Sequence, residues 1–142
     1  MACEPDDAQR NRGPDFEEMC IRDSDKPDAL EGPFFEETIY VTPSREPAEV
    51  QQELLETTAQ AVRALGFRHG PVHAELRHNS EGGWMLEMHA RPIGGLCARS
   101  LRFTGGIALE ELILRHALGE DVSSVQLADG ASGCLLYTSR CV

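Results

Sequence analysis

The spacing of hydrophobic and polar residues along the chain predicts short strands and two helices. A run rich in Phe, Ile, Tyr and Val predicts a strand over residues 34–41, and the turn-forming Thr-Pro-Ser that follows predicts its end. Apolar residues recur at helical spacing over residues 45–65 and 109–118. Gly66 and Gly119 follow these two segments directly and suit the ends of helices.

Two further segments, residues 72–76 and 84–90, alternate apolar residues with mostly polar ones. The stretch between them is rich in turn-forming residues, so the pattern predicts an antiparallel hairpin with its turn near Glu81. The turn places Glu75 opposite Glu87 and His73 opposite His89 on one face. The other face carries Val72, Ala74, Leu76, Leu86, Met88 and Ala90. The expected fold class is therefore α+β, with an antiparallel sheet and two packed helices.

The bulk composition narrows the class of protein. The 142 residues are enough for one domain, and a net charge of −11 argues against a DNA-binding surface, which needs clustered Lys and Arg. No apolar run is long enough to cross a membrane. The five cysteines form no CxxC pair, so we expect no disulfide framework. A cytoplasmic protein with neither nucleic-acid nor membrane partners is the expectation.

Both ends of the chain have sequences that a DNA-sequencing adaptor would encode. The segment from Glu18 to Ser24 back-translates to a transposon end used to fragment DNA, and the segment from Cys134 to Ser139 back-translates to its reverse complement. We therefore expect residues 1–24 to be disordered and non-native, residues 25–133 to be the genuine segment, and residues 134–142 to be an adaptor-derived tail. The alternative is a coincidental disordered tail and C-terminal strand.

The hairpin brings two carboxylates, Glu75 and Glu87, directly across a strand pair, where like charges repel. Arg77 and Arg91 lie on the same face and could neutralise them as a structural network. A divalent cation could do the same, because Mg²⁺ uses one or two carboxylates together with substrate phosphates. The pattern alone leaves both interpretations open. The first corresponds to a non-catalytic α+β binding module with arginine-paired surface carboxylates.

The string around Glu75, followed after eleven intervening residues by Glu87-Met88-His89-Ala90-Arg91-Pro92-Ile93-Gly94-Gly95, resembles the metal-binding segment of ATP-grasp ligases. That family shows two glutamates about a dozen residues apart, then x-Asn-x-Arg and glycines. The sequence is most similar to the carboxylase-like and L-amino-acid-ligase-like branch of the family. The resemblance covers nearly all of residues 25–133. The resemblance implies a C-terminal part of an ATP-grasp domain.

The resemblance also implies roles for individual residues. Glu75 and Glu87 would bind Mg²⁺ or Mn²⁺ that bridges the phosphates of ATP. His89 stands where the family has Asn as a third ligand, and imidazole suits Mg²⁺ less well than oxygen does. Arg91 would stabilise phosphoryl oxygens, and Gly94 and Gly95 would let the backbone approach the substrate.

The implied reaction is ATP-dependent ligation of a carboxylate to an amine or similar nucleophile through an acyl phosphate. Its substrates would be small molecules, and the parent enzyme a possible homo-oligomer. The family's glycine-rich phosphate loop is not visible here, and Lys26 lies in the wrong context for the phosphate-binding lysine. We therefore expect the chain alone to bind ATP only weakly and to be inactive.

Several other residues have a structural and a functional interpretation. Surface carboxylates such as Glu36 and Glu37 are more often solvated than part of a site. His73 fits a satisfied sheet histidine better than a group that supports the metal ligands. Cys97 fits a small packing residue, since no activating base is evident. Arg99 and Arg102 fit either solvent exposure or contact with an anionic substrate.

Overall fold

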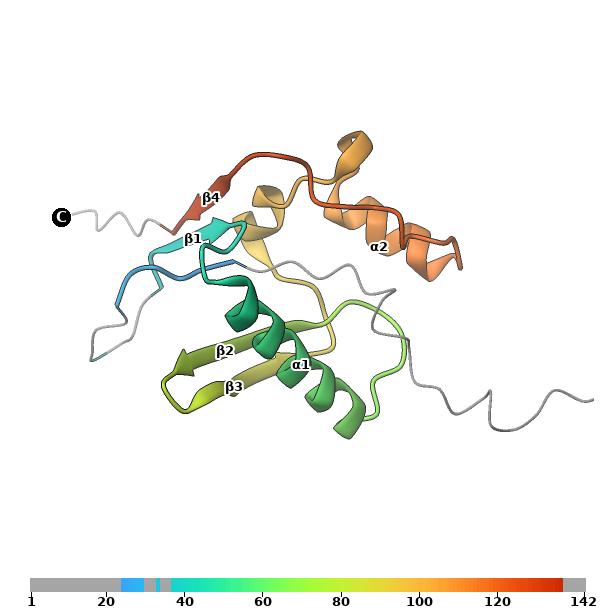
Figure 1. Cartoon of the computed structure of the whole chain (residues 1–142). Coiled ribbons are helices and arrows are strands. Elements are labelled where there is room, and N and C mark those ends of the chain that lie inside the picture. Colours follow the sequence, from blue (N-terminus) through green and yellow to red (C-terminus); the bar gives the residue numbers. More distant parts are fainter. Residues whose placement is uncertain (1–23, 30–32, 34–36, 137–142) are drawn as a thin grey trace, which may run out of the picture.

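The computed structural model describes residues 24–29, 33 and 37–136. Figure 1 shows the order of the elements along the chain. They are β1 (Ile39–Thr42), α1 (Ala48–Ala64), β2 (His73–Asn79), β3 (Gly82–His89), the 3₁₀ helices η2 (Gly95–Ser100) and η3 (Thr104–Gly106), α2 (Leu109–Ala117) and β4 (Ser132–Leu135). The α+β class predicted from the sequence is confirmed. Of the predicted strand 34–41, residues 34–36 lie outside the described residues, as does Glu36 with its predicted solvation.

Helix α1 begins at Ala48, three residues after the predicted start, because Pro47 has extended backbone angles and occupies the N-cap. Its end matches the prediction. Leu65 is the C-cap, and Gly66 follows with a φ of 73°, which a residue with a Cβ rarely adopts. The amides of Gly66 and Phe67 then donate to carbonyls of the last turn. This arrangement is a standard glycine-terminated helix end.

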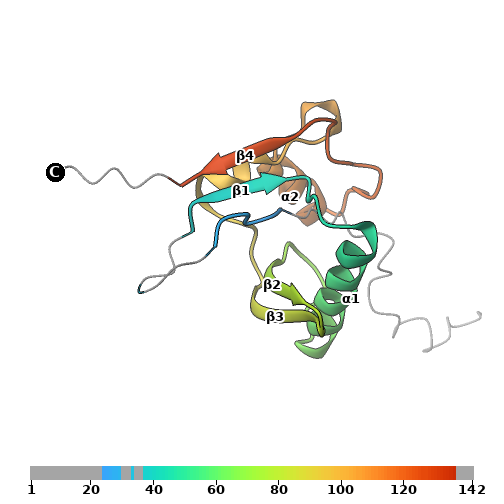
Figure 2. The ribbon, with the colours of Figure 1, turned by 60° about the vertical axis from the view of Figure 1, so that its left-hand side comes forward.

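The strands form two separate two-stranded antiparallel sheets, β1 with β4 and β2 with β3. Figures 1 and 2 show α1 lying against the β2–β3 hairpin, while the β1–β4 pair lies on the other side of the molecule. Backbone hydrogen bonds join Asp25 to Val41, so the segment before β1 runs antiparallel to that strand. The β1–β4 pairing includes Cys134 and Leu135, residues of the predicted adaptor-derived tail.

The β2–β3 register confirms the pairing of Glu75 with Glu87 and of His73 with His89. The prediction was wrong closer to the turn, where Leu76 pairs with Met85 and not with Leu86. The turn contains only Ser80 and Glu81, and a bulge after Glu75 restores the predicted pairing. Such a bulge places one extra residue on one strand. Leu86 is consequently 57% exposed instead of lying on the packed face.

Helix α1 packs on the hairpin through its polar as well as its apolar residues. Glu53 Oε1 accepts a hydrogen bond of 2.8 Å from the amide of Gly83, and Glu53 Oε2 lies 3.4 Å from His78 Nε2. A Cβ on Gly83 would lie 3.1 Å from a methyl group of Leu54. The glycine therefore permits the close approach of α1 to β3, and the hairpin gains a fixed position beneath the helix.

The described part of the chain has a small core. Its buried apolar residues come from β1, α1, η2, β4, α2 and the segment before η3: Tyr40, Ala59, Val62, Cys97, Phe103, Leu112 and Cys134. Tyr40, Cys97 and Cys134 cluster together, with Ile93 packed against them. This cluster fixes the segment after β3 against the β1–β4 pair, and it supports the prediction that Cys97 is a packing residue.

Candidate metal and nucleotide site

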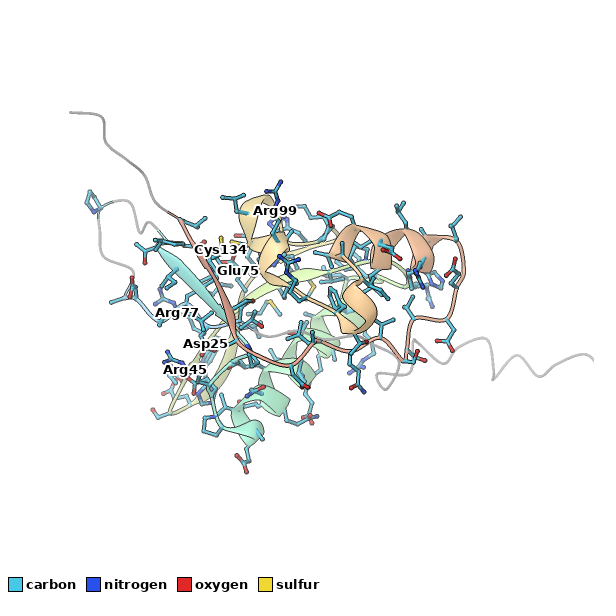
Figure 3. The ribbon with its side chains drawn as sticks, turned by 90° about the horizontal axis from the view of Figure 1, so that it is seen from above. Asp25, Arg45, Glu75, Arg77, Arg99 and Cys134 are labelled. Carbon is cyan, nitrogen blue, oxygen red and sulfur yellow. The ribbon has the colours of Figure 1, made fainter. Side chains whose placement is uncertain are left out.

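The candidate site lies on the part of the hairpin where β2 and β3 carry Glu75 and Glu87. The two residues are direct partners across the strands, and the bulge lies immediately beside them. Side chains of paired residues project to the same face of a hairpin. The structure therefore brings together the two carboxylates that the sequence singled out. Figure 3 labels Glu75 together with Arg77 from the same strand.

Both oxygens of Glu75 have cationic or polar partners. Lys26 Nζ lies 2.7 Å from Oε2, and His73 Nε2 lies 3.2 Å from Oε1. The Glu75 side chain is only 22% exposed. From the sequence, Lys26 was considered only as a phosphate-binding lysine in the wrong context, so its contact with Glu75 is the main finding that sequence reasoning missed.

Lys26 also donates to Glu37 Oε1, and the Tyr40 hydroxyl donates to Glu37 Oε2. The ammonium lies 5.2 Å from the centre of the Tyr40 ring, a distance suited to a cation–π contact. Glu37 is therefore not a solvated surface carboxylate, as the sequence favoured, but part of a half-buried cluster. A lone lysine followed by proline in an acidic loop gave no periodic signal that would have placed it there.

The charges in this cluster shift the pKa values of its members in opposite directions. Burial alone would raise the pKa of Glu75, but the hydrogen bonds and charges of Lys26 and His73 outweigh it and lower that pKa. Burial likewise would lower the pKa of Lys26, but its bonds to Glu37 and Glu75 raise it well above the usual range. Burial and the bond to Glu37 raise the pKa of Tyr40. At neutral pH, Glu75 is thus an anion facing a lysine cation.

Glu87 lies in a more exposed environment. Its carboxylate accepts a hydrogen bond from His89 Nε2, and that bond is the largest cause that lowers the pKa of Glu87. The charge of Arg91 contributes in the same direction, although the Arg91 guanidinium makes its hydrogen bond to the Pro92 carbonyl, at 3.1 Å. His89 therefore contacts Glu87 directly.

In the ion pairs of the described ranges, neither Glu75 nor Glu87 is paired with an arginine. Lys26 pairs with Glu75 instead, and His73 and His89 contact Glu75 and Glu87. The structural alternative had given that role to Arg77 and Arg91. Within the described residues, the ion pairs of Glu75 and Glu87 therefore differ from the arginine network that this alternative requires.

Gly94 and Gly95 follow the hairpin, Gly94 as the N-cap and Gly95 as the first residue of η2. Gly95 has a φ of 62°, which favours glycine, and Gly94 has extended backbone. A Cβ placed on either residue would meet no atom within 4 Å. Open space therefore lies beside this stretch of backbone, as close approach of a ligand would require.

The residues present fit a metal–nucleotide complex better than a self-contained metal site. Among residues 24–29, 33 and 37–136, no three or more His, Cys, Asp or Glu side chains are arranged to hold a metal ion. Mg²⁺ needs no such group, because substrate phosphates and water supply most of its ligands. Two ionised carboxylates, Glu75 and Glu87, on one face provide the hard oxygen ligands that this ion prefers.

Comparison with known proteins gives the class of protein that this fold and site define. The sequence profile of the ATP-grasp domain matches residues 17–100, so the chain belongs to the ATP-grasp superfamily of ATP-dependent ligases. Among solved structures, the chain is similar to an L-amino acid ligase from Bacillus licheniformis, with 30% identity and a TM-score of 0.58. The match covers 72% of this chain and only 28% of that enzyme. No curated protein matches the chain.

The family and the α+β fold predicted from the hairpin motif are confirmed by the profile match and by the solved ligase. Within the part of the chain that the structure describes, no helix is long and apolar enough to span a membrane.

Proposed function

We propose that this chain is part of an ATP-dependent ligase that joins a small-molecule carboxylate to an amine or similar nucleophile through an acyl phosphate. The observation that carries the proposal is the pairing of Glu75 with Glu87 across the hairpin, both with lowered pKa values. Metal ligation requires deprotonated carboxylates. The similarity to an L-amino acid ligase supports the same class of reaction.

In this proposal, Glu75 and Glu87 hold Mg²⁺ or Mn²⁺ together with the phosphates of ATP. The metal, when bound, offsets the negative charge that builds up during phosphoryl transfer. His89 lies beside Glu87 and either contributes a third ligand or orients Glu87 through its hydrogen bond. A bond of that kind to a ligating carboxylate commonly affects metal affinity.

Arg91 supplies a planar guanidinium for the transferring phosphoryl group or the acyl phosphate. Its side chain is exposed, and its bond to the Pro92 carbonyl leaves other donor groups for an anion. The open backbone at Gly94 and Gly95 allows the substrate to approach closely. In the proposed reaction a carboxylate oxygen attacks the γ-phosphorus and releases ADP, and the amine then displaces phosphate from the acyl phosphate.

The chain spans about 28% of the length of the solved ligase. We propose that the phosphate-binding lysine and the glycine-rich loop belong to the remainder of a longer enzyme that acts on small molecules in the cytoplasm and that forms homo-oligomers. We propose no nucleic-acid or membrane partner. The 142-residue chain should then bind ATP with an affinity weaker than micromolar, and tight ATP binding by the chain alone would contradict this assignment.

The metal role is tested by titrating the 142-residue chain with Mn²⁺ in the presence of ATP and by measuring free Mn²⁺ by electron paramagnetic resonance. Glu75→Gln and Glu87→Gln should each weaken binding about tenfold or more. Glu111→Gln is the matched control, because Glu111 forms an exposed ion pair with Arg115 on α2, away from the hairpin. Binding by both site variants at the level of the unsubstituted chain would overturn the assignment of these carboxylates.

The acyl-phosphate step is tested in the longer enzyme. Hydroxylamine should trap the acyl phosphate as a hydroxamate, whose formation depends on ATP and on the carboxylate substrate and is strongly reduced by Arg91→Met. Ligation that proceeds at the normal rate without any trapped hydroxamate would argue against this intermediate.

A further inference from the structure

The segment that carries Lys26 is anchored to β1 and to the stretch that follows β1. The amide of Asp25 donates to the Val41 carbonyl at 2.8 Å, and the amide of Val41 donates to the Asp25 carbonyl at 3.0 Å. Asp25 Oδ2 also accepts a bond of 2.9 Å from the amide of Arg45. Asp25 and Arg45 are labelled near each other in Figure 3. The backbone next to Lys26 is therefore held, and its side chain reaches from a fixed point.

The Lys26 side chain connects the segment around β1 to the hairpin. Its ammonium contacts Glu37, which precedes β1, and Glu75, which belongs to β2. Only 25% of the Lys26 side chain is exposed, so solvent screens these contacts less than it screens surface ion pairs. A monovalent cation of the protein itself thus lies between two carboxylates.

The position of this ammonium matters for any second cation at Glu75. A metal ion bound to Glu75 would lie within a few ångströms of the ammonium, and two cations repel strongly at such distances. Lys26 contacts Oε2 of Glu75, and Oε1 of the same carboxylate contacts His73. Neither oxygen is therefore vacant for a metal ion. Metal binding at Glu75 therefore has to act against Lys26.

We propose that Lys26 is a positioning residue for Glu75, an internal counter-ion that holds this carboxylate in place and competes with a divalent cation for it. The inference rests on the proposed metal role of Glu75. In the metal-free chain, Lys26 offsets part of the repulsion between Glu75 and Glu87, in addition to the contacts that His73 and His89 make with them. It also keeps the affinity for a free divalent cation low.

The test uses the 142-residue chain and Mn²⁺ alone, without nucleotide. Lys26→Met should increase Mn²⁺ affinity about five- to tenfold, because it removes the competing charge and leaves Glu75 ionised. Lys26→Arg keeps the positive charge and should retain the original affinity. Arg115→Met removes the same charge from the exposed pair with Glu111 on α2 and should change the affinity less than twofold.

Two additions keep the outcome unambiguous. Lys26→Gln is used if Lys26→Met does not fold, as judged by circular dichroism, and it should increase the affinity in the same direction. Lys26→Met combined with Glu75→Gln should lose the gain, since the freed carboxylate is then absent. Loss of fold would weaken Mn²⁺ binding, so an increase cannot come from structural damage.

The results separate this inference from the proposed function. If Glu75→Gln weakens Mn²⁺ binding but neither neutral Lys26 variant strengthens it, the competition is overturned and the metal role survives. If Glu75→Gln and Glu87→Gln leave Mn²⁺ binding unchanged in the presence and the absence of Lys26, both proposals are overturned. A gain in the neutral Lys26 variants that depends on Glu75 supports both.

Discussion

The contact between α1 and the hairpin is the part of the fold that fixes the candidate site, and Gly82→Ala tests it. Gly82 has a φ of 124°, and a Cβ there would lie 2.7 Å from Glu53 Oε1. The same oxygen accepts the hydrogen bond from the Gly83 amide. The substitution therefore strains the backbone, at about 1–3 kcal/mol, and displaces a hydrogen bond worth about 1 kcal/mol.

We expect Gly82→Ala to lower the free energy of unfolding by about 2–4 kcal/mol, the sum of these two effects. Two controls separate them. Gly70 has a φ of 99°, and a Cβ there would meet no atom within 4 Å, so Gly70→Ala reports backbone strain alone. Gly83→Ala has no positive φ but meets Leu54 at 3.1 Å, so it reports close approach alone. The expected order of destabilisation is Gly82, then Gly70, then Gly83.

The assay is urea unfolding followed by circular dichroism and by the fluorescence of Trp84, the single tryptophan, which lies on β3. Removing the Glu53 side chain with Glu53→Ala should reduce the cost of Gly82→Ala to that of Gly70→Ala, as a double-mutant cycle measures. If, with Glu53 present, Gly82→Ala lowers the free energy of unfolding no more than Gly70→Ala does, then Glu53 does not contact the hairpin in solution. That result would refute the reasoning.

Two further predictions follow from the pKa shifts. Burial, together with the nearby Cys134, raises the pKa of Cys97 to about 11, so we expect iodoacetamide to modify Cys97 in the folded chain much more slowly than in urea at pH 7.5; equal rates, measured by peptide mapping, would contradict its burial. The lowered pKa of Glu75 stabilises the fold above pH 4.5, and this stabilisation is lost as the pH falls through the lowered value. Melting temperatures from pH 7 to pH 3 should therefore fall less steeply for Glu75→Gln than for the unsubstituted chain, and parallel curves would show that the ion pair contributes nothing.

The elements that the sequence predicted best are those with a strong local signal. The end of α1, just before Gly66, and the hairpin around Ser80 and Glu81 follow from periodicity and turn residues. The predicted turn was centred on Glu81, whereas the observed turn is centred between Ser80 and Glu81. The pairing of Glu75 with Glu87 was nevertheless predicted correctly, because the extra residue at the bulge, Leu86, makes up for this difference. In the alternation of apolar and polar residues along a strand, a bulge appears only as one extra residue. A turn shifted along the chain would give the same pattern, so the sequence does not distinguish the two.

The cluster around Lys26 illustrates what local patterns do not contain. Lys26 is 11 residues from Glu37 in the sequence, and both are much further from Glu75. The pairing of Asp25 with Val41 holds the segment of Lys26 beside β1, where the three side chains meet. That pairing is a tertiary contact of a segment that reads as a loop. The pairing of Glu75 with Glu87 was therefore predictable from the residues of the hairpin, whereas the counter-ion of Glu75 was not.

The assignment of Glu75 and Glu87 as ligands of the metal–nucleotide complex is tested most directly by nuclear magnetic resonance of the ¹⁵N-labelled 142-residue chain. Substoichiometric Mn²⁺, added with a non-hydrolysable ATP analogue, broadens the amide signals close to the ion. We predict that the amides of Glu75 and Glu87 broaden first, and that those of α2 stay sharp. Broadening centred instead on the acidic surface residues Glu120 and Asp121, with the hairpin signals unchanged, would contradict the assignment.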